Sequence, residues 1–282
     1  MTLWSREKTA VMSVQYSQYT WEYFLDSMKR CGYKSVDFWA GAPHFCPEMF
    51  RSKEEARRRA THIRGQLDGL GMSVACYTLE QINYPVNIAS ADPTHRAISV
   101  EYFLTGMELA QILNTPNVFV TSGVGQRDIP REQSMDYAVD SIRTLSREAG
   151  RRGMQMVIEQ LQPFETNLGV TLKDIREIKE RVDSPHLKVC VDVVAMAVAG
   201  ETLDAYLDAF GKDLVLVHMS DGSPGGHFVP GDGTLDVTGY FRTLKERDFD
   251  GFVTLEINST RYLDDPHGAL MRTMEYLEQE VF

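Results

Sequence analysis

Four apolar runs in the second half of the chain each end in, or are broken by, one ionisable side chain. These side chains are Glu159 after 156–158, Asp192 after 189–191, His218 after 215–217 and Glu256 after 253–255. Burying such a group unpaired costs several kcal/mol. At equivalent depths on four successive strands, the four side chains would converge on one point. Three carboxylates and one imidazole suit a divalent cation such as Mn²⁺, Mg²⁺, Co²⁺ or Fe²⁺.

Each of these residues taken alone has a simpler interpretation. A single carboxylate at a strand end more often caps a helix or pairs with a basic side chain. Coincidence is a poor explanation for four in succession. Three carboxylates brought together without a cation would also repel one another and favour protonation. The pattern therefore predicts a metal centre formed by all four residues.

Short apolar, β-branched-rich runs of the kind that form buried parallel strands recur along the whole chain. The eight runs are Val11–Gln15, Ser35–Trp39, Ser73–Tyr77, Asn117–Thr121, Gln155–Glu159, Leu187–Asp192, Leu214–His218 and Phe252–Ile257. Segments with helical spacing lie between them. Gly32 is expected to end the first of these helices, and Thr171 to cap the fifth.

Eight strands alternating with eight helices predict a (β/α)8 TIM barrel, and the 282 residues agree with the roughly 250 that this fold needs. A doubly wound open sheet would usually carry a glycine-rich turn after its first strand, whereas this chain has Tyr16-Ser17-Gln18-Tyr19 there. No stretch of 1–282 resembles a linker. We therefore expect a single TIM-barrel domain.

Composition excludes several classes of protein. The net charge of −11 disfavours binding to nucleic acid. The four cysteines are widely scattered, which suggests free thiols in a reducing compartment. The first residues are polar rather than a signal peptide, and no apolar run is long enough to cross a membrane. A cytoplasmic protein acting on a small molecule is expected.

Further polar and aromatic residues are expected near the barrel mouth, on the long segments that follow the strands. The candidate substrate contacts are Glu165, His227, His44, Tyr77, Glu80 and Trp39. Each has an alternative interpretation: Glu165 as a helix cap, His227 as an ordinary loop histidine and Trp39 as part of the core.

The residues around these positions resemble the xylose-isomerase-like barrels of the sugar isomerase/epimerase superfamily, and within it the ketose 3-epimerases, with fructoselysine 3-epimerases the most similar. The likeness runs over nearly the whole chain. Its motifs are Ile158-Glu159-Gln160-Leu161-Gln162-Pro163-Phe164-Glu165, Val191-Asp192, His218, Leu255-Glu256, Asp37-Phe38-Trp39-Ala40-Gly41-Ala42-Pro43-His44, Tyr77-Thr78-x-Glu80, Tyr84-Pro85-x-Asn87 and 227–233.

The resemblance implies a metal-dependent epimerase that inverts C3 of a ketose through a cis-enediolate. Glu159, Asp192, His218 and Glu256 match the family's metal ligands, with Mn²⁺ the expected ion and Mg²⁺, Co²⁺, Fe²⁺, Ni²⁺ or Zn²⁺ as alternatives. Glu159 and Glu256 also match its two acid/base carboxylates, and Glu165 matches a residue that binds substrate hydroxyls. The resemblance further suggests a homo-oligomer.

Two departures from the usual ketose 3-epimerase pattern bear on the substrate. Ala195 replaces a substrate-binding histidine, and His227 replaces an arginine. The resemblance to fructoselysine 3-epimerases, which share these two features, therefore favours an amine-linked ketose over a simple free one.

Other activities remain open at this level. The same barrel and metal site could serve an aldose–ketose isomerase or a keto-inositol dehydratase. An endonuclease-IV-like repair enzyme would need more strand-end histidines and a basic groove. A non-catalytic sugar-binding barrel would not need two carboxylates at the metal.

Overall fold

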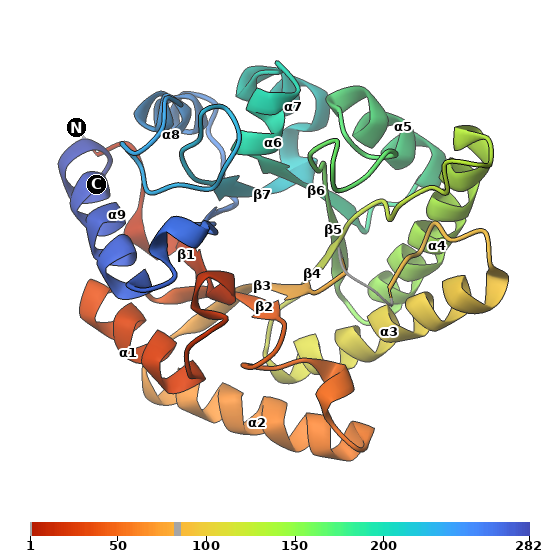
Figure 1. The fold of residues 1–282 in the computed structure, drawn as a ribbon, viewed down its shortest axis with the longest axis horizontal. Helices are drawn as coiled ribbons and strands as arrows, with labels where there is room; N and C mark the ends of the chain where they lie inside the picture. The colour runs from red at the N-terminus through yellow and green to blue at the C-terminus, as the bar shows by residue number, and fades with distance from the viewer. Residues whose placement is uncertain (1, 82–85) are drawn as a thin grey trace.

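The strands close into one barrel. The computed structural model of the protein describes residues 2–81 and 86–282, so Tyr84 and Pro85 of the motif noted above lie outside the described residues. Parallel pairing runs in chain order from β1 to β8, and β8 pairs with β1 to complete the ring. Figure 1 looks along the barrel and shows the helices packed around it. The predicted (β/α)8 fold is confirmed.

Each of the eight predicted runs overlaps a strand. The strands are β1 (Thr9–Met12), β2 (Ser35–Ala40), β3 (Ser73–Leu79), β4 (Asn117–Val120), β5 (Gln155–Glu159), β6 (Leu187–Asp192), β7 (Leu214–Met219) and β8 (Phe252–Leu255). Several boundaries differ by one or two residues, and the first run differs most: β1 begins at Thr9 and ends at Met12, and Ser13–Tyr16 forms a 3₁₀ turn. There the Ser13 hydroxyl oxygen accepts a hydrogen bond from the Trp39 backbone N–H at 3.2 Å.

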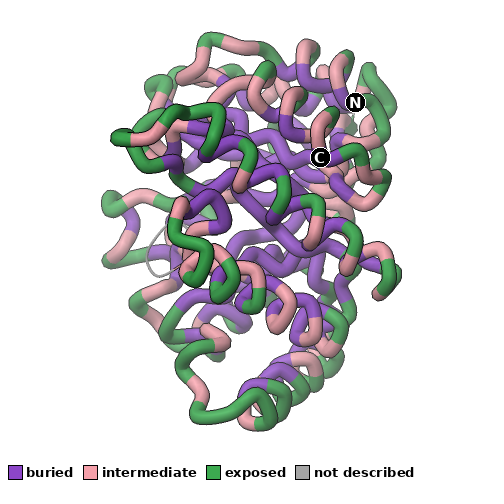
Figure 2. Tube along the Cα trace, turned by 90° about the vertical axis from the view of Figure 1, so that its right-hand side faces the viewer, coloured by how far each residue is buried: buried purple, intermediate pink, exposed green. Residues whose placement is uncertain are grey.

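The helices cover the outside of the barrel and bury their apolar faces against it (Figure 2). They are α1 (Trp21–Cys31), α2 (Lys53–Gly69), α3 (Pro93–Ile112), α4 (Arg131–Arg151), α5 (Leu172–Val182), α6 (Val193–Val198), α7 (Leu203–Phe210), α8 (Val237–Glu246) and α9 (Pro266–Glu280). In the described part of the chain, each helix is too short or too polar to span a bilayer.

Helix ends agree with the chemistry of their terminal residues. Gly32 follows α1 with a φ of 75°, a left-handed conformation that glycine adopts without strain. Thr171 caps α5, and Asp174 completes a reciprocal capping box with it. The short helix α6 was not predicted. It begins directly after Asp192, whose carboxylate accepts hydrogen bonds from the N–H groups of Val194 and Ala195.

An apolar layer fills the barrel interior beneath the strand ends. It is formed by buried side chains from five consecutive strands: Cys76, Phe119, Val157, Cys190 and Leu216. Because this layer is packed, the barrel is a filled core rather than a pore. The strand ends above it therefore rest on an apolar floor.

Asp221 organises the long segment between β7 and α8. Its carboxylate is 2% exposed and accepts hydrogen bonds from the backbone N–H groups of Gly222, Gly231, Gly233 and Leu235. A single side chain thus ties together residues on both sides of His227. This arrangement fixes the segment that carries His227 over the barrel mouth.

We predict that Asp221→Ala lowers the free energy of unfolding by about 3 kcal/mol, because a buried hydrogen bond to a charged acceptor contributes roughly 1.5–3 kcal/mol, and one buried and three partly exposed donors would lose theirs. Asp236→Ala is the matched control. Asp236 caps α8 at the end of the same segment through one bond to the Gly239 N–H, so it should cost about 1 kcal/mol. Urea unfolding measures both, and equal losses would contradict the assigned role of Asp221.

Candidate metal centre

The barrel brings the four predicted ligands to one place. Glu159 and Asp192 are the last residues of β5 and β6, His218 is the next-to-last residue of β7, and Glu256 directly follows β8. One ligand atom from each side chain lies within 4.8 Å of those of the other three. Because parallel strands end at the same rim of a barrel, their neighbouring positions place these groups together.

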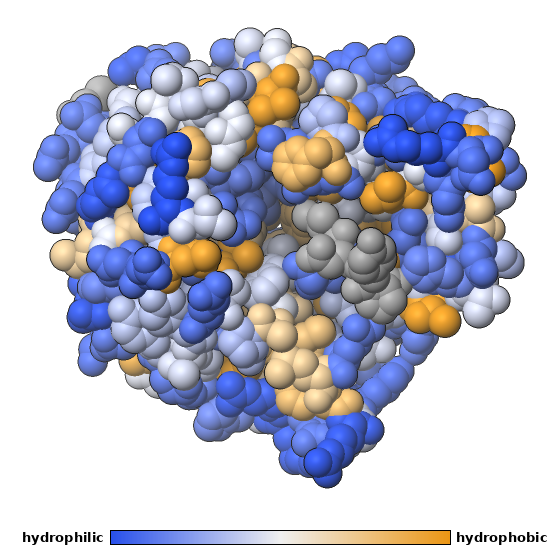
Figure 3. All heavy atoms as spheres, viewed as in Figure 1, coloured by the Kyte–Doolittle hydropathy of each residue, from blue (hydrophilic) through white to orange (hydrophobic). Residues whose placement is uncertain are grey.

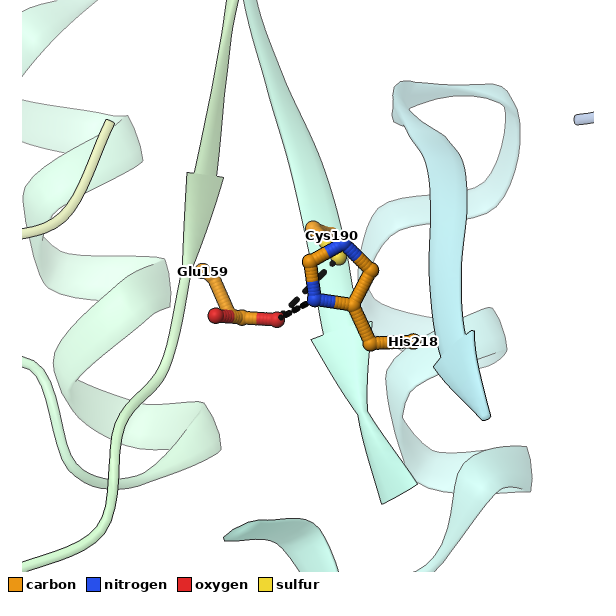
Figure 4. A group of neighbouring side chains, drawn as sticks. All are labelled: Glu159, Cys190 and His218. Carbon is orange, nitrogen blue, oxygen red and sulfur yellow. Dashed lines mark hydrogen bonds and ion pairs between the residues drawn. The ribbon is translucent and has the colours of Figure 1, made fainter. Parts of the chain in front are cut away.

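The His218 imidazole is the centre of the group. Its Nδ1 atom lies 2.6 Å from Oε1 of Glu159 and 3.0 Å from Oε2 of Glu256. The ring is 1% exposed and stacks on Phe119, with the ring centroids 5.5 Å apart. Cys190 also contacts this group, with its Sγ atom 3.4 Å from Oε1 of Glu159 (Figure 4). Glu159, Cys190 and His218 form a second, overlapping group with metal-ligand chemistry.

The unsatisfied atoms at this point test whether the residues suit a cation. Among the described residues, neither nitrogen of His218 nor Oε2 of Glu256 has a hydrogen-bond partner, although all three atoms are buried. Buried polar atoms normally have partners. Carboxylate oxygens and an imidazole nitrogen that converge at 2.6–3.0 Å suit a shared positive ion. The donor set of three carboxylates and one imidazole therefore fits a divalent metal.

Asp192 has two roles in the structure. Its Oδ1 atom caps α6, and its Oδ2 atom lies 2.8 Å from Nε2 of His227. His227 also lies 3.9 Å from Oε2 of Glu256. Burial alone would lower the pKa of His227, but the charges of Asp192 and Glu256 outweigh it and raise this pKa to about 10. Of the predicted substrate contacts, His227 thus lies at the ligand group itself.

Burial changes the acidity of two glutamates in the mouth. It raises the pKa of Glu159 to about 7, although the neighbouring His218 opposes the shift. It also raises the pKa of Glu165 to about 7, and the charges of Glu256 and Asp192 act in the same direction. The Glu165 carboxylate accepts a hydrogen bond from the Gln162 backbone N–H at 2.9 Å. Raised pKa values of this kind are common at functional sites.

The remaining predicted substrate contacts separate into two groups. Trp39 is half-buried and donates its indole N–H to Glu80 at 2.9 Å, so these two act as a pair. His44 and Tyr77 are almost completely buried. His44 packs against Trp21 and bonds to the Tyr19 carbonyl, and Tyr77 stacks on Phe38. The structure does not bring His44 and Tyr77 to the ligand group, and their contact with substrate stays a prediction.

Three side chains that contact His218 or Glu159 were not among the predicted site residues. These are Asp37 on β2, with Oδ2 3.3 Å from Nε2 of His218, together with Phe119 and Cys190. One signal was available for Asp37: it is a carboxylate between Val36 and Phe38 in a buried apolar strand. Phe119 and Cys190 gave no such signal, because an apolar residue in a strand is the ordinary case.

The chain belongs to the xylose isomerase-like TIM barrel family, whose model matches residues 25–280. The surface of the face drawn in Figure 3 is hollowed near its centre, within the ring of helices seen in Figure 1. Ligand sites in barrels lie at the rim formed by the strand ends, the position of the four residues described above.

Among known proteins, the chain is 25% identical over 271 residues to fructoselysine 3-epimerase of Escherichia coli O157:H7, covering 95% of this chain and 96% of the relative. Two solved structures have the same fold. L-ribulose 3-epimerase is 17% identical, with a TM-score of 0.80 over 97% of this chain and 94% of that one. The IOLI protein with a binding zinc atom is 17% identical, with a TM-score of 0.78 over 97% of each chain. The expected class, an isomerase of the epimerase type, is confirmed.

The raised pKa of Glu165 predicts a pH-dependent contribution to stability. A carboxyl whose pKa rises from 4.5 to about 7 on folding contributes stability that is fully present below pH 4.5 and is lost as the pH rises through 7. We therefore expect Glu165→Gln to gain stability relative to the wild type on going from about pH 5 to about pH 8 in metal-free protein.

Urea unfolding at both pH values measures this change. Glu246→Gln, on the exposed side of α8, is the control and should differ from the wild type equally at both pH values. A pH-independent difference for Glu165→Gln would show that the buried carboxyl is not responsible.

Proposed function

We propose that this protein is a metal-dependent epimerase that inverts C3 of a ketose or an amine-linked ketose. The observation that carries the proposal is the approach of Glu159 and Glu256, from β5 and β8, to the same nitrogen of His218. Two carboxylates that meet at one divalent cation are more than binding alone requires. They suit a reaction in which a proton leaves one face of a carbon atom and another arrives at the opposite face.

Of the four proposed metal ligands, two would also act as acid/base residues and two would only bind the ion. Asp192 and His218 would hold the ion, and Glu159 and Glu256 would hold it and also transfer protons at C3. A bound divalent ion supplies Lewis-acid stabilisation of the negative charge that develops on the substrate oxygens as the C3 proton leaves. The two glutamates exchange roles when the reaction runs in reverse.

The side chains beside the ligand group favour a substrate larger than a free ketose. Ala195 is small, and its N–H is committed to the Asp192 carboxylate. His227 is held by Asp192, and Glu165 adds a further acidic group nearby. The name of the 25% identical relative, fructoselysine 3-epimerase, supports an amine-linked ketose.

The ion itself is proposed to be Mn²⁺, since carboxylate-rich sites suit hard or borderline divalent ions. Zinc stays an alternative because the structural neighbour IOLI carries a binding zinc atom. Metal analysis of purified protein, followed by reconstitution with single ions, tests this choice.

We predict that Glu256→Gln lowers kcat by about 10²–10⁴-fold at saturating Mn²⁺, because an amide cannot exchange the proton that general acid/base catalysis requires. Metal content is measured alongside, since the amide oxygen still offers one ligand atom. Glu246→Gln on α8 is the control and should turn over like the wild type. Near-normal turnover in Glu256→Gln would rule out the two-base mechanism.

The position of hydrogen exchange identifies the reaction. When fructoselysine and a panel of free ketoses are incubated with the enzyme in D₂O, deuterium is expected at C3 of the recovered sugar. NMR and mass spectrometry measure it. Deuterium at C1 or C2 would instead indicate an aldose–ketose isomerase, and complete retention of protium would argue against proton abstraction altogether.

A further inference from the structure

Asp37 is a fully buried carboxylate that the proposed mechanism does not use. It lies on β2, and its side chain is 0% exposed. Its Oδ1 atom accepts a hydrogen bond from the Thr78 hydroxyl at 2.5 Å, and its Oδ2 atom accepts one from the Thr254 hydroxyl at 3.0 Å. Within the described ranges, no lysine or arginine forms an ion pair with it. Because burying an unpaired carboxylate is costly, its presence needs a reason.

His218 is the group that Asp37 faces. Oδ2 of Asp37 lies 3.3 Å from Nε2 of the imidazole. The two residues come from β2 and β7, which are not neighbours in the sheet, so the contact crosses the interior of the barrel. Thr254 on β8 donates to the oxygen that faces His218, whereas Thr78 on β3 donates to the other oxygen. The oxygen is therefore fixed in place and directed at one ring nitrogen.

The two nitrogens of His218 have different surroundings. Nδ1 faces the carboxylates of Glu159 and Glu256, and Nε2 faces Asp37. A neutral imidazole carries one proton, and the nitrogen that binds a metal must be the one without it. For Nδ1 to offer its lone pair toward Glu159 and Glu256, the proton must therefore be on Nε2. The Asp37 carboxylate, 3.3 Å away and not yet in hydrogen-bond geometry, would accept it there.

We propose that Asp37 is a positioning residue for the metal centre. Its carboxylate keeps the proton of His218 on Nε2 and so presents Nδ1 to the ion. The inference rests on the proposed metal-dependent function and on a general feature of metal sites, in which a carboxylate commonly accepts the second N–H of a ligating histidine. Phe119, stacked on the ring, limits its tilt while Asp37 selects its protonated nitrogen.

The competing explanation is structural. Asp37 could simply join β2 to β3 and β8 through the two threonine hydroxyls. Thr78→Val separates the two explanations, because it removes one of these bonds but leaves the oxygen that faces His218 untouched. If Asp37 only joins strands, Asp37→Asn and Thr78→Val should both reduce stability, and both should leave the metal affinity unchanged.

The first test is Mn²⁺ binding by titration calorimetry, with urea unfolding of the metal-free proteins alongside. Loss of a partner of this kind weakens metal binding by about 10–100-fold. We expect that loss for Asp37→Asn, while Thr78→Val binds Mn²⁺ like the wild type. Wild-type Mn²⁺ affinity in Asp37→Asn would overturn the inference about Asp37 but not the proposed function. Failure of the wild type to bind Mn²⁺ or Zn²⁺ would also overturn the proposed function.

The second test does not depend on Asp37→Asn and therefore remains available if that variant does not fold. Long-range ¹H–¹⁵N NMR of the Zn²⁺-loaded wild type distinguishes the nitrogen that carries the proton from the one that binds the metal. His218→Gln identifies the signal by its disappearance. We expect His218 to be protonated at Nε2 and coordinated through Nδ1. A signal protonated at Nδ1 would overturn the inference.

Discussion

The structure depends on the gathering of negative charge around one imidazole at the end of the barrel. Glu159 and Glu256 reach the same nitrogen of His218, and Asp192 lies beside them. Such a group is unfavourable unless a positive charge is present, because desolvation and mutual repulsion both act against it. The closed sheet makes the arrangement possible, since hydrogen bonds around the ring hold four strand ends in register and prevent the carboxylates from separating.

The fold could be predicted because each strand is apolar on both faces and each helix has a separate apolar stripe, so the two periodicities are distinct. The errors are local. Ser13–Tyr16 reads as a continuation of β1, but a contact from the distant Trp39 backbone fixes Ser13 in a turn. Helix α6 begins with two valines, which are typical of a strand, and the Asp192 carboxylate that follows β6 caps its first N–H groups.

The ligand residues could be predicted because an ionisable group at the end of an apolar run is unusual, and four at equivalent depths are more so. The side chains that contact these ligands could not be predicted. Asp37 meets His218 across the barrel, a contact between strands that do not pair. His44 and Tyr77 show the reverse problem: an aromatic residue near a strand end suits a sugar pocket and a core equally well, and here both are buried in aromatic clusters.

The apolar layer under the metal centre has a consequence for traffic through the enzyme. The barrel interior beneath His218 is filled by the packed side chains of Cys76, Phe119, Val157, Cys190 and Leu216. Substrate, product and solvent therefore cannot pass along the barrel axis, and all of them enter and leave through the barrel mouth. A product molecule still bound at the barrel mouth blocks the entry of the next substrate, so the rate of product release limits turnover.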